Sequence, residues 1–290
     1  MRYTSPEDAR SDLFLSAAVY LFGPLIVGLV LQLVPLGQIP GVAAVLSIAL
    51  PIVFTALVPY LLIRYRKESL RDYLQGTAGV TLGLWLAVPI LVAAGLVLLL
   101  QGDTLQLALP VARVTRLDGA FLVAQELVQW AGLAALAWYA TIKAQDAFRL
   151  QPQTIQEATA EIGRILAIVA VVSILLLSLT PAGSGLFART LTLACAPLGI
   201  AGAVVLALRR LRSPSSTSRS VLLTPTVLLA LGVFQLTLDP RRLVPSLYLA
   251  ALFGGVGLLI GLIHESRKSF YAVLALAAVV ALLSPALLVG

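Results

Sequence analysis

The chain has 290 residues, of which 60% are hydrophobic and only 11% are charged, and its mean hydropathy is +1.00. Soluble domains carry roughly 25% charged residues, so a soluble protein of this length could not hide so much apolar surface. The net charge of +7 does not indicate nucleic-acid binding, because the basic residues stand in short segments between apolar runs and form no patch. The composition therefore predicts an integral membrane protein, in which lipid solvates the apolar side chains.

Nine apolar segments predict an all-α, polytopic transmembrane helical bundle that forms one domain over residues 1–290. The polar start of the chain contains three acidic residues, and the apolar run after it is too long for a signal peptide, so we expect this run to be the first span. The fifth and seventh segments are short, which leaves eight spans as the alternative. In chain order the segments are Leu13–Pro35, Gly41–Ile63, Ala78–Leu100, Gly119–Ile142, Ile165–Thr180, Leu186–Leu208, Val221–Leu238, Val244–Ile263 and Phe270–Val289.

The positions of the basic residues predict an orientation with the N-terminus inside and the C-terminus outside. With nine spans, 15 of the 20 Lys and Arg residues fall in cytoplasmic loops. Cytoplasmic loops of membrane proteins are enriched in Lys and Arg, so this bias favours a multi-pass protein of the cell inner membrane. The five basic residues that fall outside are Arg113, Arg116, Arg189, Arg241 and Arg242.

The chain contains one cysteine and one histidine, which are too few to supply the ligands of most Cys/His metal sites. Cys195 lies in an apolar stretch and is predicted to be a small core residue. His264 is followed by Glu265, but the second histidine of a zinc-protease HExxH helix is absent. We expect His264 to be a cap at the inner end of the eighth span, beside Arg267. The sequence predicts no metal site and no cofactor.

Glu126 is the only acidic residue that lies well within a predicted span. Residues three and four apart share a helix face, so Glu126, Gln129 and Trp130 are predicted to point together into the bundle. Glu126 would lie roughly 10 Å below the outer end of its span. We hypothesise a ligand-binding or structural polar pocket in the outer half, with Glu126 and Arg189 as an ion pair, made of Gln32, Glu126, Gln129, Arg189 and Gln235. The alternative is that Glu126 only makes a structural hydrogen bond and that Arg189 extends to water.

Prolines and glycines add two expectations about packing. Five prolines interrupt predicted spans and indicate either ordinary kinked packing or an internal cavity; they are Pro24, Pro51, Pro59, Pro89 and Pro225. In the eighth segment, Gly254, Gly257 and Gly261 form a face that lets another helix approach closely. We expect that helix to belong to the same chain rather than to a dimer partner.

The order of these features resembles the CPBP family of CAAX-protease and bacteriocin-processing membrane proteins. The basic loop IRYRKESLRDYL follows two spans, and AQELVQWAG occupies the position of the family's Glu-Glu-xxx-Arg motif. Glu126 matches the second glutamate, whereas Gln125 replaces the first and Trp130 replaces the arginine. The family's later histidine motifs have no counterpart. The resemblance covers about two thirds of the chain in layout and implies a degenerate member without proteolytic activity.

Three functional classes stay open on this sequence. The first is a non-catalytic accessory or binding subunit, whose partners are the lipid bilayer and other membrane subunits, and not nucleic acid. The second is a permease or transporter with a polar site around Glu126, although no inverted repeat is evident. The third is a CPBP-type intramembrane protease, for which the chain offers too few ligands.

Overall fold

The computed structural model describes residues 5–33, 42–74, 117–148, 223–237 and 243–288, together with residues 80, 81, 83, 84 and 171. All regular structure in these ranges is helical, and no strand occurs among them. The predicted all-α class is therefore confirmed for this part of the chain. Cys195, Arg189 and the predicted segments Ile165–Thr180 and Leu186–Leu208, apart from residue 171, lie outside it, as does most of Ala78–Leu100.

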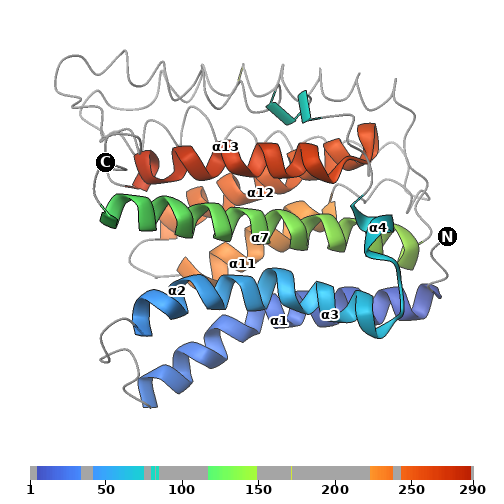
Figure 1. Ribbon diagram of the computed structural model, residues 1–290, viewed down its shortest axis with the longest axis horizontal. Helices are drawn as coiled ribbons and strands as arrows, with labels where there is room; N and C mark the ends of the chain where they lie inside the picture. Colours follow the sequence, from blue (N-terminus) through green and yellow to red (C-terminus); the bar gives the residue numbers. More distant parts are fainter. Residues whose placement is uncertain are drawn as a thin grey trace.

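The helices lie side by side in a bundle, with α1 beginning at one end and α13 finishing at the opposite end (Figure 1). They coincide with six of the nine predicted segments. Their bounds are α1 Pro6–Leu33, α2 Val42–Ile52, η2 Val53–Leu57, α3 Val58–Tyr65, α4 Leu70–Tyr73, α7 Leu117–Phe148, α11 Leu223–Thr237, α12 Leu243–Arg267 and α13 Phe270–Leu288.

Two stretches among the described residues are long and apolar enough to cross a membrane, Pro6–Leu31 and Val45–Tyr65. Only 17% and 22% of the residues in their apolar windows are buried inside the protein. Three shorter apolar helices accompany them, at Thr224–Gln235, Phe253–Glu265 and Phe270–Ala281. The count of nine spans stays a prediction.

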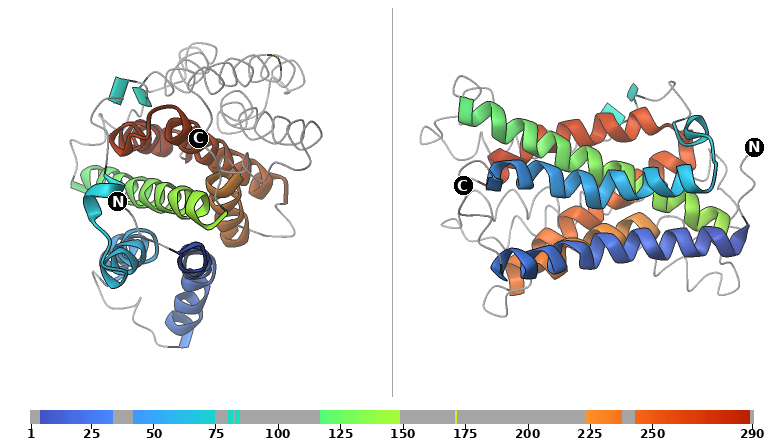
Figure 2. Two further views of the ribbon diagram at one scale, coloured as in Figure 1. Left: turned by 90° about the vertical axis from the view of Figure 1, so that its right-hand side faces the viewer. Right: turned by 60° about the horizontal axis from the view of Figure 1, so that its bottom comes forward.

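Helix α7 occupies the centre of the bundle and packs against α1, α2, η2, α11, α12 and α13 (Figure 2). Its second half, WAGLAALAWYATIKA, is apolar on nearly every face, and a helix of that kind belongs in a protein core. Leu136, Ala137, Ala140 and Ala144 are fully buried there. This central helix therefore fixes the positions of the elements around it.

Helices α2 and α3 form one continuous helix with a π-helical turn, η2, between them. The turn lies between Pro51 and Pro59, and the hydroxyl of Thr55 donates a hydrogen bond to the carbonyl of Pro51 at 2.5 Å. Helix α7 passes so closely that a methyl group at position 132, which is glycine, would collide with Thr55 Oγ1. The single turn of π-helix thus faces α7 at a point where only a glycine fits.

Glycines of α12 bring it close to α11, beside which it lies. A Cβ atom built at Gly257 would lie 2.6 Å from the carbonyl carbon of Pro225 and 2.8 Å from the nitrogen of Thr226. At Gly254 the nearest atom would be the Cβ of Ala230, at 3.3 Å. The expectation that this glycine face serves packing within the chain is confirmed for these two glycines.

Three predicted boundaries were wrong, and each error concerns buried polar residues. Helix α1 begins at Pro6 rather than at Leu13 and so includes buried Asp12. Helix α7 continues beyond Ile142 to Phe148, so Lys143 lies in the helix and is fully buried rather than in a loop. Helix α12 continues to Arg267 and carries His264 with it. His264 is buried against the ring of Trp138, edge to face at 5.0 Å, rather than capping the helix at the interface. At Lys143, ion pairs with Asp12 and Glu68 compensate the buried charge at a position where the hydropathy of the sequence falls.

Candidate functional site

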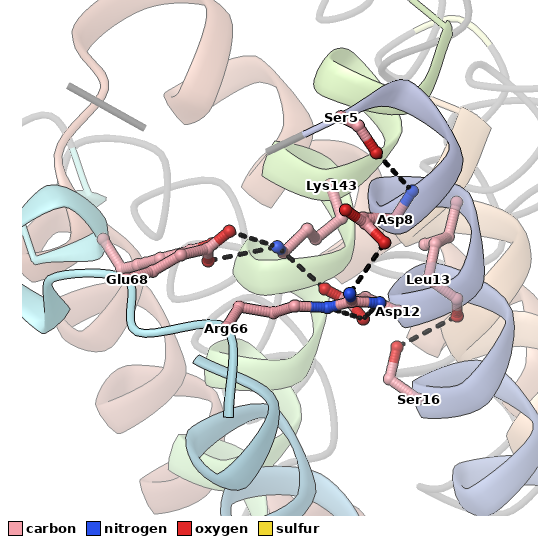
Figure 3. A network of polar contacts seen from close by, with 9 residues as sticks. Ser5, Asp8, Asp12, Leu13, Ser16, Arg66, Glu68 and Lys143 are labelled. Atoms are coloured by element: carbon pink, nitrogen blue, oxygen red, sulfur yellow. Dashed lines mark hydrogen bonds and ion pairs between the residues drawn. The ribbon is translucent and has the colours of Figure 1, made fainter. Parts of the chain in front are cut away.

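Five charged side chains from three parts of the chain meet at the end of the bundle where α1 begins (Figure 3). We call this network the charge cluster. Two acidic members come from the first turns of α1, two members come from the connection between α3 and α4, and one comes from α7. They are Asp8, Asp12, Arg66, Glu68 and Lys143.

Asp12 and Lys143 are the centre of the charge cluster. Lys143 Nζ lies 3.0 Å from Asp12 Oδ2, and it also contacts Glu68 Oε1 at 2.9 Å and Oε2 at 3.1 Å. The other carboxylate oxygen of Asp12 accepts hydrogen bonds from two nitrogens of Arg66, each at 3.1 Å. Arg66 reaches on to Asp8 at 2.7 Å. Asp12 therefore joins the two cations through separate oxygens.

Exposure falls steeply across the charge cluster. The Asp8 side chain is 45% exposed and that of Arg66 is 25% exposed, whereas Glu68 is 5%, Asp12 is 2% and Lys143 is 0% exposed. A buried ammonium is tolerated only when anions compensate for the lost water, and here two carboxylates do so. Hydrogen bonding to Asp12 raises the pKa of Arg66 above its ordinary value, and the negative charges of Asp12 and Asp8 add to the rise against a smaller opposing effect of burial.

The local sequence explains how Glu68 reaches Lys143. Helix α3 ends at Tyr65, and Lys67 adopts a left-handed conformation with φ of 56°. The amide of Glu68 then donates to the carbonyl of Ile63 at 3.0 Å, and the amide of Lys67 donates to that of Arg64 at 3.1 Å. This pair of bonds is the Schellman motif, which reverses the chain immediately after a helix. The reversal directs the Glu68 side chain back towards α7.

Aromatic residues pack around the buried members of the charge cluster, Glu68 and Lys143. The hydroxyl of Tyr73 donates to Glu68, and the indole of Trp138 donates to the backbone carbonyl of Tyr73 at 2.8 Å. The rings of Tyr73 and Tyr139 stack at 5.7 Å, and Lys143 Nζ lies 5.6 Å from the centre of the Tyr139 ring. The short helix α4 is thereby attached to α7. The hydroxyl of Tyr139 is buried and has no hydrogen-bond partner among the described residues.

The charge cluster is suited to holding helices together. Three carboxylates face two cations, and every member contacts at least one group of opposite charge. Such mutual pairing fixes α1, the α3–α4 connection and α7 in one register. Within the described ranges, no group of three His, Cys, Asp or Glu side chains is placed to hold a metal ion.

A second feature is a cavity of about 250 Å³ in the middle of the bundle, which we call the apolar groove. Side chains from α1, α2, η2, α7, α11 and α12 line it, and most of them are apolar. Its polar contributors are Tyr20, Thr55 and Gln129, and two prolines, Pro24 and Pro51, belong to its wall. The sequence had offered a cavity as one explanation for the interrupting prolines, and these two prolines do line one.

The predicted polar pocket is only partly within the described residues. Glu126 and Gln129 both lie on α7 and are half-buried, and Gln129 lines the apolar groove. Gln235 lies on α11 and is half-buried. Gln32 lies in the last turn of α1, and Arg189 lies outside the described residues, so the Glu126–Arg189 ion pair stays a prediction. Trp130 is buried and stacks on Phe253 at 4.6 Å, as expected for a side chain facing the bundle.

Sequence reasoning missed the charge cluster, although signals for it were present. Asp8 and Asp12 are four residues apart and share a helix face. The predicted topology places them on the same side of the membrane as the loop containing Arg66 and Glu68. Lys143 was assigned to a loop because the apolar segment was ended at Ile142. Extending that segment by one turn would have brought a lysine opposite two acids.

No family model, curated protein or solved structure matches this chain. The resemblance to the CPBP family therefore stays a prediction from layout.

Proposed function

We propose that this protein is a multi-pass inner-membrane protein, of nine spans with the N-terminus inside, that acts as a non-catalytic binding or accessory subunit. The observation that carries the proposal is the outward apolar surface of the first two long helices. Phe14, Ile26, Leu29 and Leu33 of α1 are between 60% and 83% exposed. An exposed apolar surface of this extent is stable next to lipid and not next to water.

The charge cluster supports the inside assignment of one end of the bundle. It contains Arg66, which the basic-residue distribution predicts to be cytoplasmic, and Lys143, which lies near the end of α7 beside it. Helix α1 begins at this end and α13 finishes at the other (Figure 1), which agrees with termini on opposite sides. The free-energy cost of placing a charged side chain near a membrane surface is far lower than the cost at the centre of the membrane.

The binding role is favoured over catalysis by the way the buried charges are used. Asp12, Glu68 and Lys143 are held by one another at 2.9 to 3.1 Å. A general acid, base or nucleophile must be able to reach a substrate, whereas these groups are engaged within the protein fold. The apolar groove, in contrast, is a space that a ligand can enter.

Cysteine labelling tests the topology. In a Cys195→Ser background, single cysteines that replace exposed Lys67, Ser215 and Asp239 are treated in intact cells with a membrane-impermeant maleimide. We expect labelling at position 239, which follows the seventh predicted span on the outside. We expect none at positions 67 and 215 until the membrane is opened, because both are predicted to be cytoplasmic. Labelling of positions 67 and 215 on opposite sides would contradict the proposed threading.

A permease is the second candidate, because proline-containing helices α1 and α2 border the apolar groove and Gln129 contributes a polar group to it. The two candidates differ in whether water reaches that group from outside. A Gln129→Cys variant that reacts with a charged, membrane-impermeant thiosulfonate would favour a permease. Reaction with an apolar, membrane-permeable reagent alone would favour binding of an apolar ligand. Lys67→Cys reports that the charged reagent is active in opened membranes.

A further inference from the structure

The apolar groove has an open wall at Gly28. A Cβ atom built at this glycine meets no atom within 4 Å, whereas one built at Gly23 would lie 2.5 Å from the ring of Phe54. The residues next to the open wall face outward: Ile26 is 60% exposed, Leu29 is 62% exposed and Val53 is 37% exposed. The groove is thus continuous with the apolar outer surface of α1 and η2.

The depth of the groove restricts what can occupy it. Gln129 precedes Lys143 by 14 residues on one helix, which corresponds to about 21 Å along the axis. The hydrocarbon core of a bilayer is about 30 Å thick, so the groove lies within that core if the charge cluster marks the inner surface. From this level the groove extends towards Leu31, near the outer end of α1. A lipid headgroup does not lie at this depth, but a hydrocarbon chain does.

The lining agrees with a hydrocarbon occupant. Leu50, Phe54, Leu133, Val233 and Phe253 supply apolar surface from four sides. Thr55 is polar, but its hydroxyl already donates to the carbonyl of Pro51, so it does not need a hydrogen-bond acceptor from a ligand. An apolar chain is therefore the occupant for which the groove offers the most contact.

We propose that the apolar groove binds the hydrocarbon chain of a bilayer lipid, entering from the outer leaflet past Gly28. This inference rests on the proposed function, because it requires α1 and η2 to face lipid. The inference identifies a lipid hydrocarbon chain as the ligand of the proposed binding subunit. The chain would pack between α1 and η2 and complete a core that the protein alone leaves open.

The test uses the full-length protein reconstituted in phosphatidylcholine vesicles, with or without bromine atoms on the acyl chains. Bromine quenches tryptophan fluorescence on close approach, and Trp130 is only 2% exposed but stacks on Phe253 of the groove wall. Each protein is measured with and without a Trp130→Phe substitution, so that the difference isolates the emission of Trp130. We expect brominated chains to quench this emission although Trp130 is buried.

Gly28→Phe is the decisive variant, because its Cβ would meet no atom within 4 Å and its ring would stand in the open wall of the groove. Gly28→Leu is a smaller second variant in case the ring disturbs folding. Leu29→Phe is the matched control, since it adds the same ring one residue further along, on an exposed surface. We expect the Trp130 quenching to be lost with Gly28→Phe, reduced with Gly28→Leu and kept with Leu29→Phe.

Equal quenching of Trp130 in the wild type and in folded Gly28→Phe would overturn the proposal, as would the absence of quenching in the wild type. The second result would mean that protein rather than lipid covers the groove. Either result, obtained together with the expected cysteine labelling, would leave the membrane topology intact and remove only the lipid site. Failure of the labelling test would remove both.

Discussion

Lys143 Nζ lies 3.0 Å from Asp12 Oδ2, although 131 residues separate them in the sequence and neither side chain is more than 2% exposed. This contact links the first helix of the protein to its central helix. Each charge also has a second partner, Arg66 for Asp12 and Glu68 for Lys143, so the pair joins two further ion pairs into one buried network. The pair therefore makes the clearest prediction about stability.

Lys143→Met should destabilise the protein by about 3–5 kcal/mol, because it leaves Asp12 and Glu68 buried without their shared cation. Thermal unfolding in detergent, followed by circular dichroism, measures the loss. Lys67→Met is the control, since Lys67 is exposed and belongs to no ion pair in the described part of the chain. The triple variant with Asp12→Asn and Glu68→Gln should recover part of the loss. If Lys143→Met melts like Lys67→Met, the pairing does not stabilise the fold.

The contrast between this pair and the helices shows what sequence alone can reveal. Long apolar runs predicted the positions of α1, α2–α3 and α7, because a run of apolar side chains is a local property of the sequence. The Asp12–Lys143 contact is not local. It depends on which helices are neighbours, and a hydropathy pattern carries no information about neighbours. The predicted end of α7 at Ile142 then removed Lys143 from the search for charges inside spans.

The polar pocket illustrates a related limit. Spacing on one helix predicted that Glu126, Gln129 and Trp130 share a face towards the bundle. Trp130 is buried and Gln129 lines the apolar groove, whereas Glu126 is half-buried and is not among the residues that line the groove. The groove that Gln129 lines is mostly apolar, because the other walls come from α1, η2 and α12. The polarity of a site depends on all of its walls, and a search that starts from polar residues on one helix overestimates it.

Lys67 is the second point at which a substitution should have a clear sign. Its left-handed conformation, with φ of 56°, is strained for every residue except glycine. Lys67→Gly should therefore stabilise the protein by about 1 kcal/mol while keeping the Schellman bonds of Glu68 and Lys67. Lys67→Val should have the opposite effect, because a branched Cβ worsens the strain. Melting temperatures that rise with valine or fall with glycine would contradict this account of the turn.

A pair of glycine substitutions tests the close approach of α11 and α12. Gly257→Ala places a methyl group 2.6 Å from the carbonyl carbon of Pro225, which belongs to the backbone and cannot move aside cheaply. We expect a loss of about 1–3 kcal/mol, the usual cost of overpacking. Gly28→Ala is the control, because open space surrounds it and alanine favours a helix over glycine by about 1 kcal/mol. Unfolding in detergent should move the two variants in opposite directions, and an unchanged or raised stability of Gly257→Ala would show that α11 and α12 separate easily.

Trp138 holds α4 through one hydrogen bond, from its indole nitrogen to the carbonyl of Tyr73 at 2.8 Å. Trp138→Phe should cost about 1–3 kcal/mol, because it removes a buried hydrogen bond. Trp130→Phe removes the same part of an indole from a site where, within the described ranges, the ring stacks on Phe253, and it should cost less. The difference between the two melting temperatures measures the contribution of the Trp138–Tyr73 hydrogen bond.

The contact of Tyr73 with Glu68 couples α4 to the charge cluster, so losing the Trp138–Tyr73 hydrogen bond should weaken the cluster. A Lys143→Met substitution added to Trp138→Phe should then cost less than it does alone. Strict additivity of the two substitutions would show that α4 and the charge cluster are independent.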